Sequence, residues 1–200
     1  MSKITVIVGS HRNESQSNKI GRMINAKLAE LNNVESTSIL DLAVTELPFW
    51  KEEYAQAESE QIQKVGEQLK DSDAFVIISP EWNGMVPSAL KNLFLLYSAN
   101  EFGHKPALIA SVSSGIGGTY PVTELRSSTY KNSRICYIPE HLIFRDVEGI
   151  FNGLAGTDND AERYMSERTD FCLDYLTLYS DSLKQVRANQ PVNEEFGNGM

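Results

Sequence analysis

Residues 74–84 read AFVIISPEWNG, an unbroken apolar run that ends in a loop of proline, glutamate, tryptophan, asparagine and glycine. Because the run is apolar on both faces, it predicts a strand buried inside a parallel sheet. Residues 85–92 read MVPSALKN and predict a helix that begins at Pro87 or Ser88. The loop therefore lies at the carboxyl end of a strand in an α/β chain, which is where open parallel sheets hold their ligands.

Strands and helices alternate on both sides of this stretch. The apolar patterns predict strands over residues 3–8, 34–42, 74–79, 106–112 and 133–138, the last of which residues 142–147 could extend. Helical spacing predicts helices over residues 18–31, 62–69, 87–98 and 121–130, and a long final helix over 161–186. The second strand is half polar, which is typical of a strand near the edge of a sheet.

Five strands that alternate with five helices predict an α/β fold, a doubly wound parallel sheet with helices on both faces. The flavodoxin-like strand order, 2-1-3-4-5, is the simplest one that brings the first and third loops together at a switch point. The length of 200 residues suits a single domain, which we expect over residues 1–187. Residues 149–159 are rich in turn formers, Asp158 or Asp160 could cap the final helix, and residues 188–200 predict a poorly ordered tail.

Composition excludes several classes of protein. The net charge of -9 and the pI of about 4.9 argue against nucleic acid as a partner, because a phosphate backbone needs a basic face. Cys136 and Cys172 are too few for a disulfide framework or a zinc site, so we expect buried, reduced thiols. The three histidines have no metal-ligand spacing. No apolar run approaches the roughly 20 residues that span a bilayer, and the chain starts directly in a strand, so we expect a cytoplasmic protein without a membrane partner.

The loop after the first strand, residues 9–18, reads GSHRNESQSN. It lacks both the Gly-x-x-x-x-Gly-Lys-Ser/Thr phosphate loop and the Gly-x-Gly-x-x-Gly dinucleotide fingerprint. Its hydroxyls, its arginine and the start of a helix suit a phosphate monoester dianion, although serines here could simply cap the helix. The candidate phosphate ligands are Ser10, Arg12, Ser15, Ser17 and Asn18.

The loop after the third strand suits a flat ring with hydrogen-bonding edges, such as a flavin. Main-chain N–H groups could reach the polar edge of the ring, the ring of Trp82 or Pro80 could cover its face, and Gly84 permits close approach. Glu81 could fix the turn by accepting main-chain amides, and Asn83 can both donate and accept. The alternative is an ordinary surface turn with a packing tryptophan.

Three further segments are less specific. Residues 111–118, SVSSGIGG, could line the other side of a ring or form a flexible connection, and Tyr120 could lie near a ligand or against the next helix. Residues 47–50, LPFW, are more typical of core or of a subunit contact than of a substrate wall. The chain shows no Ser/His/Asp or Cys/His arrangement, and flavin chemistry needs no protein nucleophile.

Taken together, these loops resemble the NADPH-dependent FMN reductase family of flavodoxin-like proteins, which includes quinone, azo-dye and chromate reductases. The resemblance is carried by GSxRxxSxS at 9–17, by SPEWNGxxPxxLKN at 79–92, and by Gly117-Gly118 with Leu125-Arg126 seven residues later, and it covers residues 4–147. Two positions differ from the family pattern. Trp82 stands where the family usually has tyrosine, and Asn18 is shifted by one from the asparagine that is usual near Ser17.

The resemblance implies non-covalent FMN, reduction by NADPH or NADH, and a homodimer or homotetramer with the flavin near a subunit interface. The electron acceptor would be a small molecule such as a quinone, an azo compound, a metal oxyanion or free flavin. The alternatives are a flavodoxin-like electron carrier that does not oxidise NAD(P)H itself, and a flavin-free regulatory domain. By position, Ser10, Arg12, Ser15, Ser17 and Asn18 would hold the phosphate, Pro80, Glu81, Trp82, Asn83 and Gly84 the isoalloxazine, and Ser111, Val112, Ser113, Ser114 and Gly115 its opposite edge.

Overall fold

A computed structural model describes residues 1–52, 59–153, 160–189 and 194–198. Its sheet has five parallel strands in the order β2-β1-β3-β4-β5, so the predicted flavodoxin-like fold and strand order are confirmed. The strands are β1 (Ser2–Val8), β2 (Val34–Asp41), β3 (Ala74–Pro80), β4 (Pro106–Val112) and β5 (Cys136–Phe144). The half-polar β2 lies at an edge of the sheet, as its sequence predicts.

The strand order reverses direction between β1 and β3, which creates the switch point. β1 pairs with β2 on one side and with β3 on the other, with Val6 opposite both Ile39 and Val76. At the carboxyl ends, the N–H of Gly9 donates to the carbonyl of Ile78 over 2.8 Å. The loops that follow β1 and β3 therefore leave the sheet side by side.

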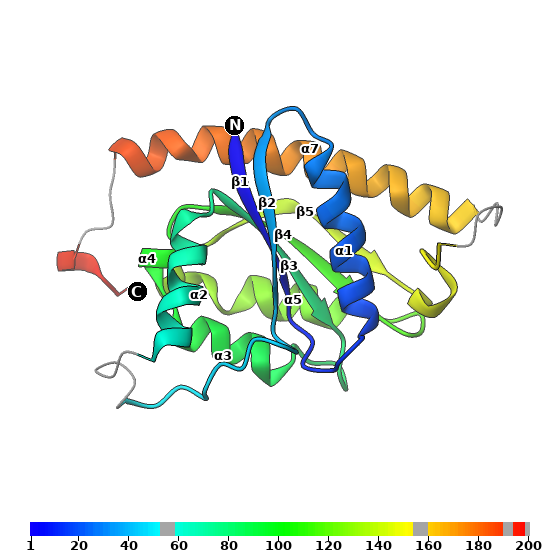
Figure 1. The fold of residues 1–200 in the computed structure, drawn as a ribbon, viewed down its shortest axis with the longest axis horizontal. Coiled ribbons are helices and arrows are strands. Elements are labelled where there is room, and N and C mark those ends of the chain that lie inside the picture. The colour runs from blue at the N-terminus through cyan, green and yellow to red at the C-terminus, as the bar shows by residue number, and fades with distance from the viewer. Residues whose placement is uncertain (53–58, 154–159, 190–193, 199–200) are drawn as a thin grey trace.

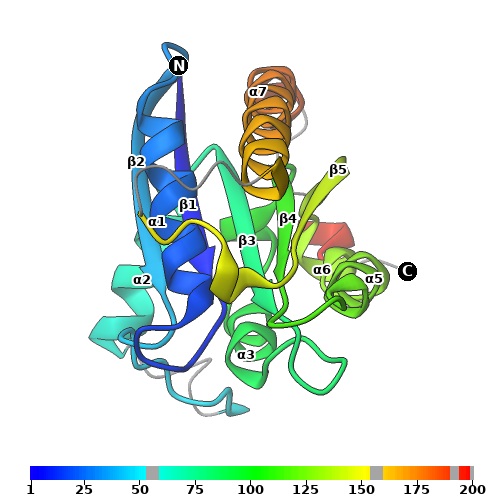
Figure 2. The same cartoon turned by 90° about the vertical axis from the view of Figure 1, so that its right-hand side faces the viewer.

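Helices cover both faces of the sheet (Figures 1 and 2). One face carries α1 (Gln16–Ala29) and α7 (Asp160–Asn189), whose buried apolar side chains form one core cluster with alternate residues of the strands. The opposite face carries α2 (Glu60–Asp71), α3 (Ser88–Leu96) and α5 (Thr119–Ser127), which form a second cluster. Both faces of β3 are fully buried, which explains its unbroken apolar sequence.

The structure differs from the sequence prediction around β5. The strand runs over Cys136–Phe144 as one piece, whereas Ser133 ends the short helix α6 (Tyr130–Ser133). The pairing with β4 shifts register between Ala107 and Ile109, where β5 passes through Pro139. The guanidinium of Arg126 donates to the carbonyls of Ile138, Pro139 and Glu140 over 2.7–3.2 Å, and so stabilises this irregular stretch. A second short helix, α4 (Ala99–Phe102), also has no counterpart in the sequence prediction.

The final helix extends over 30 residues and ends at Asn189. Asp160 is its first residue, while Asp158 lies outside the described residues. In the described part of the tail, Glu194–Phe196 forms a short 3-10 turn, and Arg134 donates to the carbonyl of Phe196. Residues 190–193 and 199–200 lie outside the described residues, so the expected disorder of the tail and the domain boundary at 187 stay predictions.

Both cysteines are free in the structure. Burial raises the pKa of the Cys136 thiol, and it raises the pKa of the Cys172 thiol to about 11. Both side chains are therefore neutral thiols at pH 7, which suits a packing role. Across the described ranges, no helix is both long and apolar enough to span a bilayer.

Candidate cofactor site

Four loops converge on one cavity at the carboxyl edge of the sheet. The loops follow β1, β3, β4 and β5, and the cavity volume is about 110 Å³. Small-ligand pockets usually exceed about 300 Å³, so the cavity would enclose only part of a mononucleotide. The predicted residues that line it are Ser10, Arg12, Ser15, Ser17, Pro80, Glu81, Trp82, Val112 and Ser114.

The start of the first loop is fixed by close packing. A Cβ added to Gly9 would lie 2.7 Å from the carbonyl oxygen of Ile78 and 2.8 Å from Cδ2 of Leu90, so only glycine fits here. The buried hydroxyl of Ser10 then accepts from the N–H of Arg12 over 3.2 Å. This contact bends the loop back toward the cavity and leaves the Arg12 guanidinium exposed at its rim.

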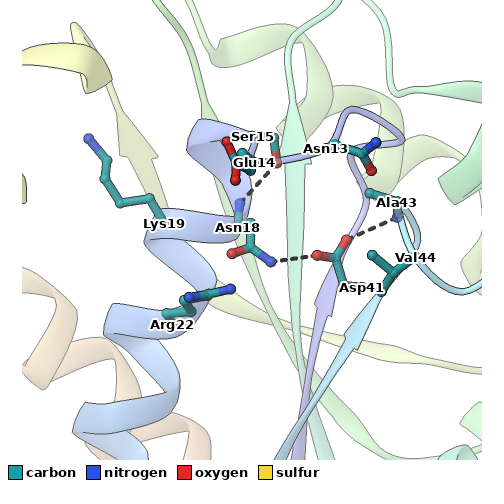
Figure 3. A pocket seen from close by; sticks show the side chains of 9 residues that line it. All are labelled: Asn13, Glu14, Ser15, Asn18, Lys19, Arg22, Asp41, Ala43 and Val44. Atoms are coloured by element: carbon teal, nitrogen blue, oxygen red, sulfur yellow. Dashed lines mark hydrogen bonds between the residues drawn. The ribbon is translucent and has the colours of Figure 1, made fainter.

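The three polar residues at the start of α1 have different surroundings. Ser15 caps the helix, with its Oγ accepting from the N–H of Asn18 over 3.1 Å, and Ser17 is buried against the cavity. The side-chain amide of Asn18 donates to the carboxylate of Asp41 at the end of β2, and Asn18 is absent from the lining of the cofactor cavity. Figure 3 shows this pair among the residues that line a neighbouring hollow. The volume of that hollow is about 580 Å³. The geometry therefore favours Ser17 over Asn18 as a cavity ligand.

The Asn83-Gly84 pair of the third loop forms a tight hairpin turn. Both residues have positive φ, 50° and 72°, and the N–H groups of Trp82 and Met85 each donate to the other's carbonyl. These are the features of a type I′ turn, for which Asn-Gly is the preferred sequence. The N–H of Glu81 donates to Val112 O, so it is also used within the fold. Among the described residues we find no acceptor for the N–H groups of Asn83 and Gly84, which stay available to a ligand edge.

Glu81 joins the third loop to the fourth. Its carboxylate accepts from the N–H of Gly118 over 2.7 Å, and a Cβ on Gly117 would approach Glu81 Oε1 to 2.9 Å. Gly118 has φ of 100°, and a Cβ there would lie 2.4 Å from Cγ2 of Ile143. The Gly117-Gly118 pair therefore lets α5 begin directly against the loop after β3, residues 80–84, which we call the ring loop. The ring of Tyr120, in the first turn of α5, packs over Gly84 at 3.8 Å from an added Cβ.

The later residues of the 79–92 motif form contacts with α5 and with the 47–50 segment. Lys91 forms an ion pair with Glu124, whose carboxylate also accepts from the N–H of Val86 over 2.7 Å. Partial burial alone would raise the pKa of Glu124, but the hydrogen bonds from Lys91 and Val86 and the charge of Lys91 hold the pKa below its usual value. The side chain of Asn92 is buried and bridges to the 47–50 segment, accepting from the N–H of Trp50 and donating to Pro48 O.

Trp82 contacts two side chains of the first loop. Its ring stacks on His11 with centroids 5.2 Å apart and planes 27° apart, and the Arg12 guanidinium carbon lies 5.9 Å from the ring centroid. The indole remains 40% exposed. Trp82 therefore links the ring loop to the loop after β1, residues 9–18, which we call the phosphate loop. It also presents a flat apolar surface at the mouth of the cavity.

The fourth loop contributes alternate residues, as an extended chain does. Val112 and Ser114 line the cavity, whereas Ser111 and Ser113 are buried on the other side, where Ser113 Oγ accepts from the N–H of Gly115. Ser111 Oγ is fully buried without a hydrogen-bond partner, and it lies 3.5 Å from the Cβ position of Gly118. The sequence prediction of five consecutive lining residues therefore does not match the placement of these side chains.

Three lining residues escaped the sequence analysis: Gln16, Val147 and Glu148. Gln16 follows the cap of α1, and its buried Oε1 has no partner. Val147 and Glu148 come from the loop after β5, which Lys19 fastens to α1 by donating to the carbonyls of Val147 and Ile150 over 2.7 Å. Gln16 lies inside the 9–18 loop, which the sequence does identify. Residues 147–148 carry no motif of their own, because only the folded sheet brings them near α1.

The donor set fits a phosphate monoester. Hydroxyls of Ser10, Ser15 and Ser17 surround the start of a 14-residue helix, whose first N–H groups have no intrahelical acceptor. Arg12 adds the positive charge, while Glu148, exposed at the rim, opposes it. The unpaired Gln16 Oε1 can accept from a hydroxyl of a bound chain. Within the described part of the protein, no group of three or more His, Cys, Asp or Glu side chains could hold a metal ion.

Comparison with known proteins identifies the family. The chain is 32% identical over 197 residues to a quinone reductase of Pseudomonas putida, covering 92% of this chain and 96% of that protein. It is 28% identical over 152 residues to an NADPH azoreductase of a Bacillus species, covering 74% and 82%. Among solved structures, FerB, a flavoenzyme NAD(P)H:(acceptor) oxidoreductase from Paracoccus denitrificans, shares the fold, with a TM-score of 0.67, 19% identity and coverage of 91% and 98%. The profile of the NADPH-dependent FMN reductases matches residues 2–148, and the chain belongs to that family.

Proposed function

We propose that this protein takes hydride from NADPH or NADH and delivers the electrons to a quinone or azo compound through FMN bound in the four-loop cavity. The family supplies the cofactor and the nicotinamide reductant. The observation that carries the proposal is the meeting of a phosphate donor set with the ring loop. Both flank one cavity, which Pro80, Glu81 and Trp82 line on the side of the ring loop. Asn83 and Gly84 lie outside this lining, at the turn of the same loop, and their N–H groups have no acceptor among the described residues.

The chain's own residues would bind FMN and orient it. Ser10, Ser15, Ser17 and Arg12 would hold the phosphate, and Gln16 would accept from the ribityl chain. Pro80, Glu81 and Trp82 would lie along the ring, with the N–H groups of Asn83 and Gly84 directed at its polar edge. Val112 and Ser114 would line the other side, with Ser111, Ser113 and Gly115 supporting them from behind, and Asn18 would position the loop through Asp41.

FMN, when bound, supplies the ability to take up a hydride and pass on its two electrons. The protein contributes fixed main-chain dipoles where negative charge grows on the ring. The overall reaction balances as one hydride from NAD(P)H plus one proton from solvent, which together reduce a quinone to its hydroquinone. Among the described residues, none in the cavity is a thiol or an imidazole, and this chemistry requires no protein nucleophile.

We further propose that the protein acts as a homodimer or homotetramer in the cytoplasm. The small enclosed volume of the cavity supports an added wall from a second subunit. Exposed apolar side chains of the ring loop and of the 47–50 segment, Met85, Phe49 and Trp50, offer the surface for it. Two free thiols suit a reducing compartment.

The test is an anaerobic visible spectrum of the FMN-reconstituted, desalted protein during addition of NADPH. We expect a bound flavin band that bleaches with one equivalent of NADPH. A bound flavin that stays oxidised would indicate an electron carrier reduced by a partner protein. Loss of all flavin on desalting would overturn the cofactor site.

A further inference from the structure

The hollow that the Asn18–Asp41 pair lines has no role in the proposed function. Its volume is about 580 Å³, and it lies between the phosphate loop, the start of α1 and the turn that follows β2. We call it the β2 hollow. Ser15 lines both the β2 hollow and the cofactor cavity, so the two spaces share one wall residue. A volume of this size lies within the range of small-ligand pockets.

Asp41, the last residue of β2, places a carboxylate in this hollow. Dinucleotide-binding α/β folds carry an acidic residue about 20 residues after their phosphate loop, and that residue binds a ribose hydroxyl. Asp41 follows Asn18 by 23 residues and takes the same place after the first helix, although the glycine fingerprint of those folds is absent. Its two oxygens accept from the Asn18 amide and from the N–H of Ala43. Each oxygen keeps a lone pair for a further donor.

Arg22 supplies the uncommitted positive charge of the β2 hollow. Lys19, one turn earlier on α1, also lines the hollow, but its ammonium is fully used. It donates to Val147 O, Ile150 O and Asn152 Oδ1 over 2.7–2.8 Å, and an ammonium has three donors. Across the described residues, the exposed guanidinium of Arg22 has no hydrogen-bond or ion-pair partner. A guanidinium of this kind binds a phosphate through paired N–H donors.

The turn after β2 holds an apolar side chain in water. The main-chain oxygen of Asp41 accepts from the N–H groups of Val44 and Thr45 over 3.3 and 2.9 Å, which fixes the turn. Val44 lines the hollow and is nevertheless 73% exposed. Figure 3 shows Arg22 and Val44 on the two sides of the Asn18–Asp41 pair. A flat apolar ring placed against Val44 would remove this surface from water.

We propose that the β2 hollow binds an adenosine phosphate. The adenine would lie against Val44, a ribose hydroxyl would donate to Asp41, and a phosphate would pair with Arg22. Glu14, exposed in the same lining, is the remaining charge and opposes the phosphate.

Two dinucleotides carry this group. One is NADPH, through its adenosine 2′-phosphate, and in that case the inference rests on the proposed function and names where the reductant is recognised. The other is FAD, whose adenosine half would continue from a flavin phosphate held beside Ser15, a residue of both spaces.

The first arm of the test titrates the FMN-loaded protein, in which the cofactor cavity is filled, by calorimetry. The probes are 2′,5′-ADP, 5′-AMP and 2′,3′-dideoxyadenosine 5′-monophosphate. The dideoxy compound should bind about fivefold more weakly than 5′-AMP, because it has no ribose hydroxyl for Asp41. Arg22→Ala should weaken binding of 2′,5′-ADP about tenfold, and Val44→Ala should weaken binding of both 2′,5′-ADP and 5′-AMP about threefold.

Two matched controls keep the effects local. Lys64→Ala removes the same charge from an exposed position on α2, and Val186→Ala removes the same side-chain atoms from an exposed position on α7. Both should leave every affinity within about twofold of the wild type.

The second arm distinguishes the two sources of the group. FAD and FMN are titrated separately into the apoprotein. FAD that binds more tightly than FMN in the wild type, and loses this advantage in Arg22→Ala and Val44→Ala, assigns the hollow to FAD. A tenfold loss of 2′,5′-ADP affinity in Arg22→Ala, with 5′-AMP affinity unchanged, assigns it to NADPH. Affinities for the adenosine nucleotides and for FAD that are the same in both variants as in the wild type would overturn the proposal.

Failure of the proposed function is recognised separately. Bleaching of the bound flavin is measured on the wild type at saturating NADPH. Bleaching that fails, while the adenosine nucleotides bind with the expected effects of the variants, refutes the reductase and supports the adenosine site. Normal bleaching with nucleotide affinities that no variant alters refutes only the adenosine site.

Discussion

The carboxylate of Glu81 accepts a 2.7 Å hydrogen bond from the N–H of Gly118, and this contact joins the loop after β3 to the residue that precedes α5. A charged acceptor on a main-chain amide contributes about 1.5–3 kcal/mol. Replacing Glu81 by alanine should therefore speed amide hydrogen exchange at Gly118 and weaken FMN binding about tenfold. Glu81→Gln keeps an acceptor oxygen, so it should restore part of the exchange protection at Gly118 and part of the FMN affinity. Glu35→Ala, at an exposed position on β2, serves as the control. Equal exchange at Gly118 in the alanine variant and the wild type would show that the contact is absent in solution.

Arg12 and Glu148 should act in opposite directions on the phosphate. Arg12→Ala removes the positive charge at the rim and should weaken FMN binding about 10- to 100-fold without altering the circular dichroism spectrum. Glu148→Gln removes the opposing carboxylate and should tighten binding about two- to threefold at low salt, with the gain lost at high salt. Titration of FMN by fluorescence quenching measures both. Wild-type affinity in Arg12→Ala would mean that the phosphate lies elsewhere.

Gly9 should be irreplaceable for packing reasons alone. An alanine Cβ would lie under 3 Å from Ile78 O and from Leu90, so Gly9→Ala should lower the free energy of unfolding by about 1–3 kcal/mol. Gly149 provides the matched control, because nothing lies within 4 Å of its Cβ position and its φ is not positive. Urea denaturation compares the two variants. A loss at Gly9 no larger than that at Gly149 would contradict the close approach of the first loop to β3.

Lys105 makes stability depend on pH in an unusual direction. Its ammonium is buried and donates to the carbonyls of Leu69 and Lys70 at the end of α2, and burial lowers its pKa from 10.5 to about 8. Between these values the unfolded chain binds the proton and the folded chain does not, so stability rises with pH from about 8 to 10.5. The free energy of unfolding rises by at most about 3 kcal/mol over this range.

The measurement compares the free energy of unfolding of the wild type with that of Lys105→Met across this window. Tyr97 and Tyr137, whose pKa values burial raises, are common to both proteins and cancel in the difference. We expect the free energy of unfolding of the wild type to rise relative to that of Lys105→Met as the pH increases from 8 to 10.5. A difference that is constant from pH 8 to 10.5 would show that Lys105 is solvated.

The sequence predicts the fold where local pattern and tertiary environment agree. The apolar run of β3 needs two covered faces, and the half-polar β2 needs one open edge, so the sequence alone predicts the position of both strands. The short helices α4 and α6 could not be, because four residues carry too little periodicity. The bounds of β5 were missed because Arg126, distant in sequence, holds the strand together through Pro139.

The cavity shows the same division. Motif spacing indicates the loops after β1 and β3, but it cannot tell which side of each loop faces the ligand. Asn18 turns toward Asp41, and Ser111 and Ser113 point to the opposite side from Val112, because strand geometry alternates. Glu148 joins the site through the contacts of its loop with Lys19 and with the main chain of Ser113 and Gly115, which no local pattern marks.

The last helix closes over the first strand, and this has a consequence for synthesis. The hydroxyl of Ser180 on α7 donates to Ser2 Oγ over 2.8 Å, and Cys172 and Leu176 pack in one cluster with Val6. A ribosome delivers β1 long before α7, so the part of this face that α1 does not cover stays exposed until residues 160–189 have been made. A nascent chain that stops before residue 160 should therefore be a chaperone client, although it already contains every loop of the cavity. Synthesis of α7, rather than completion of the family motifs, is therefore the step that lets this face of the sheet become buried.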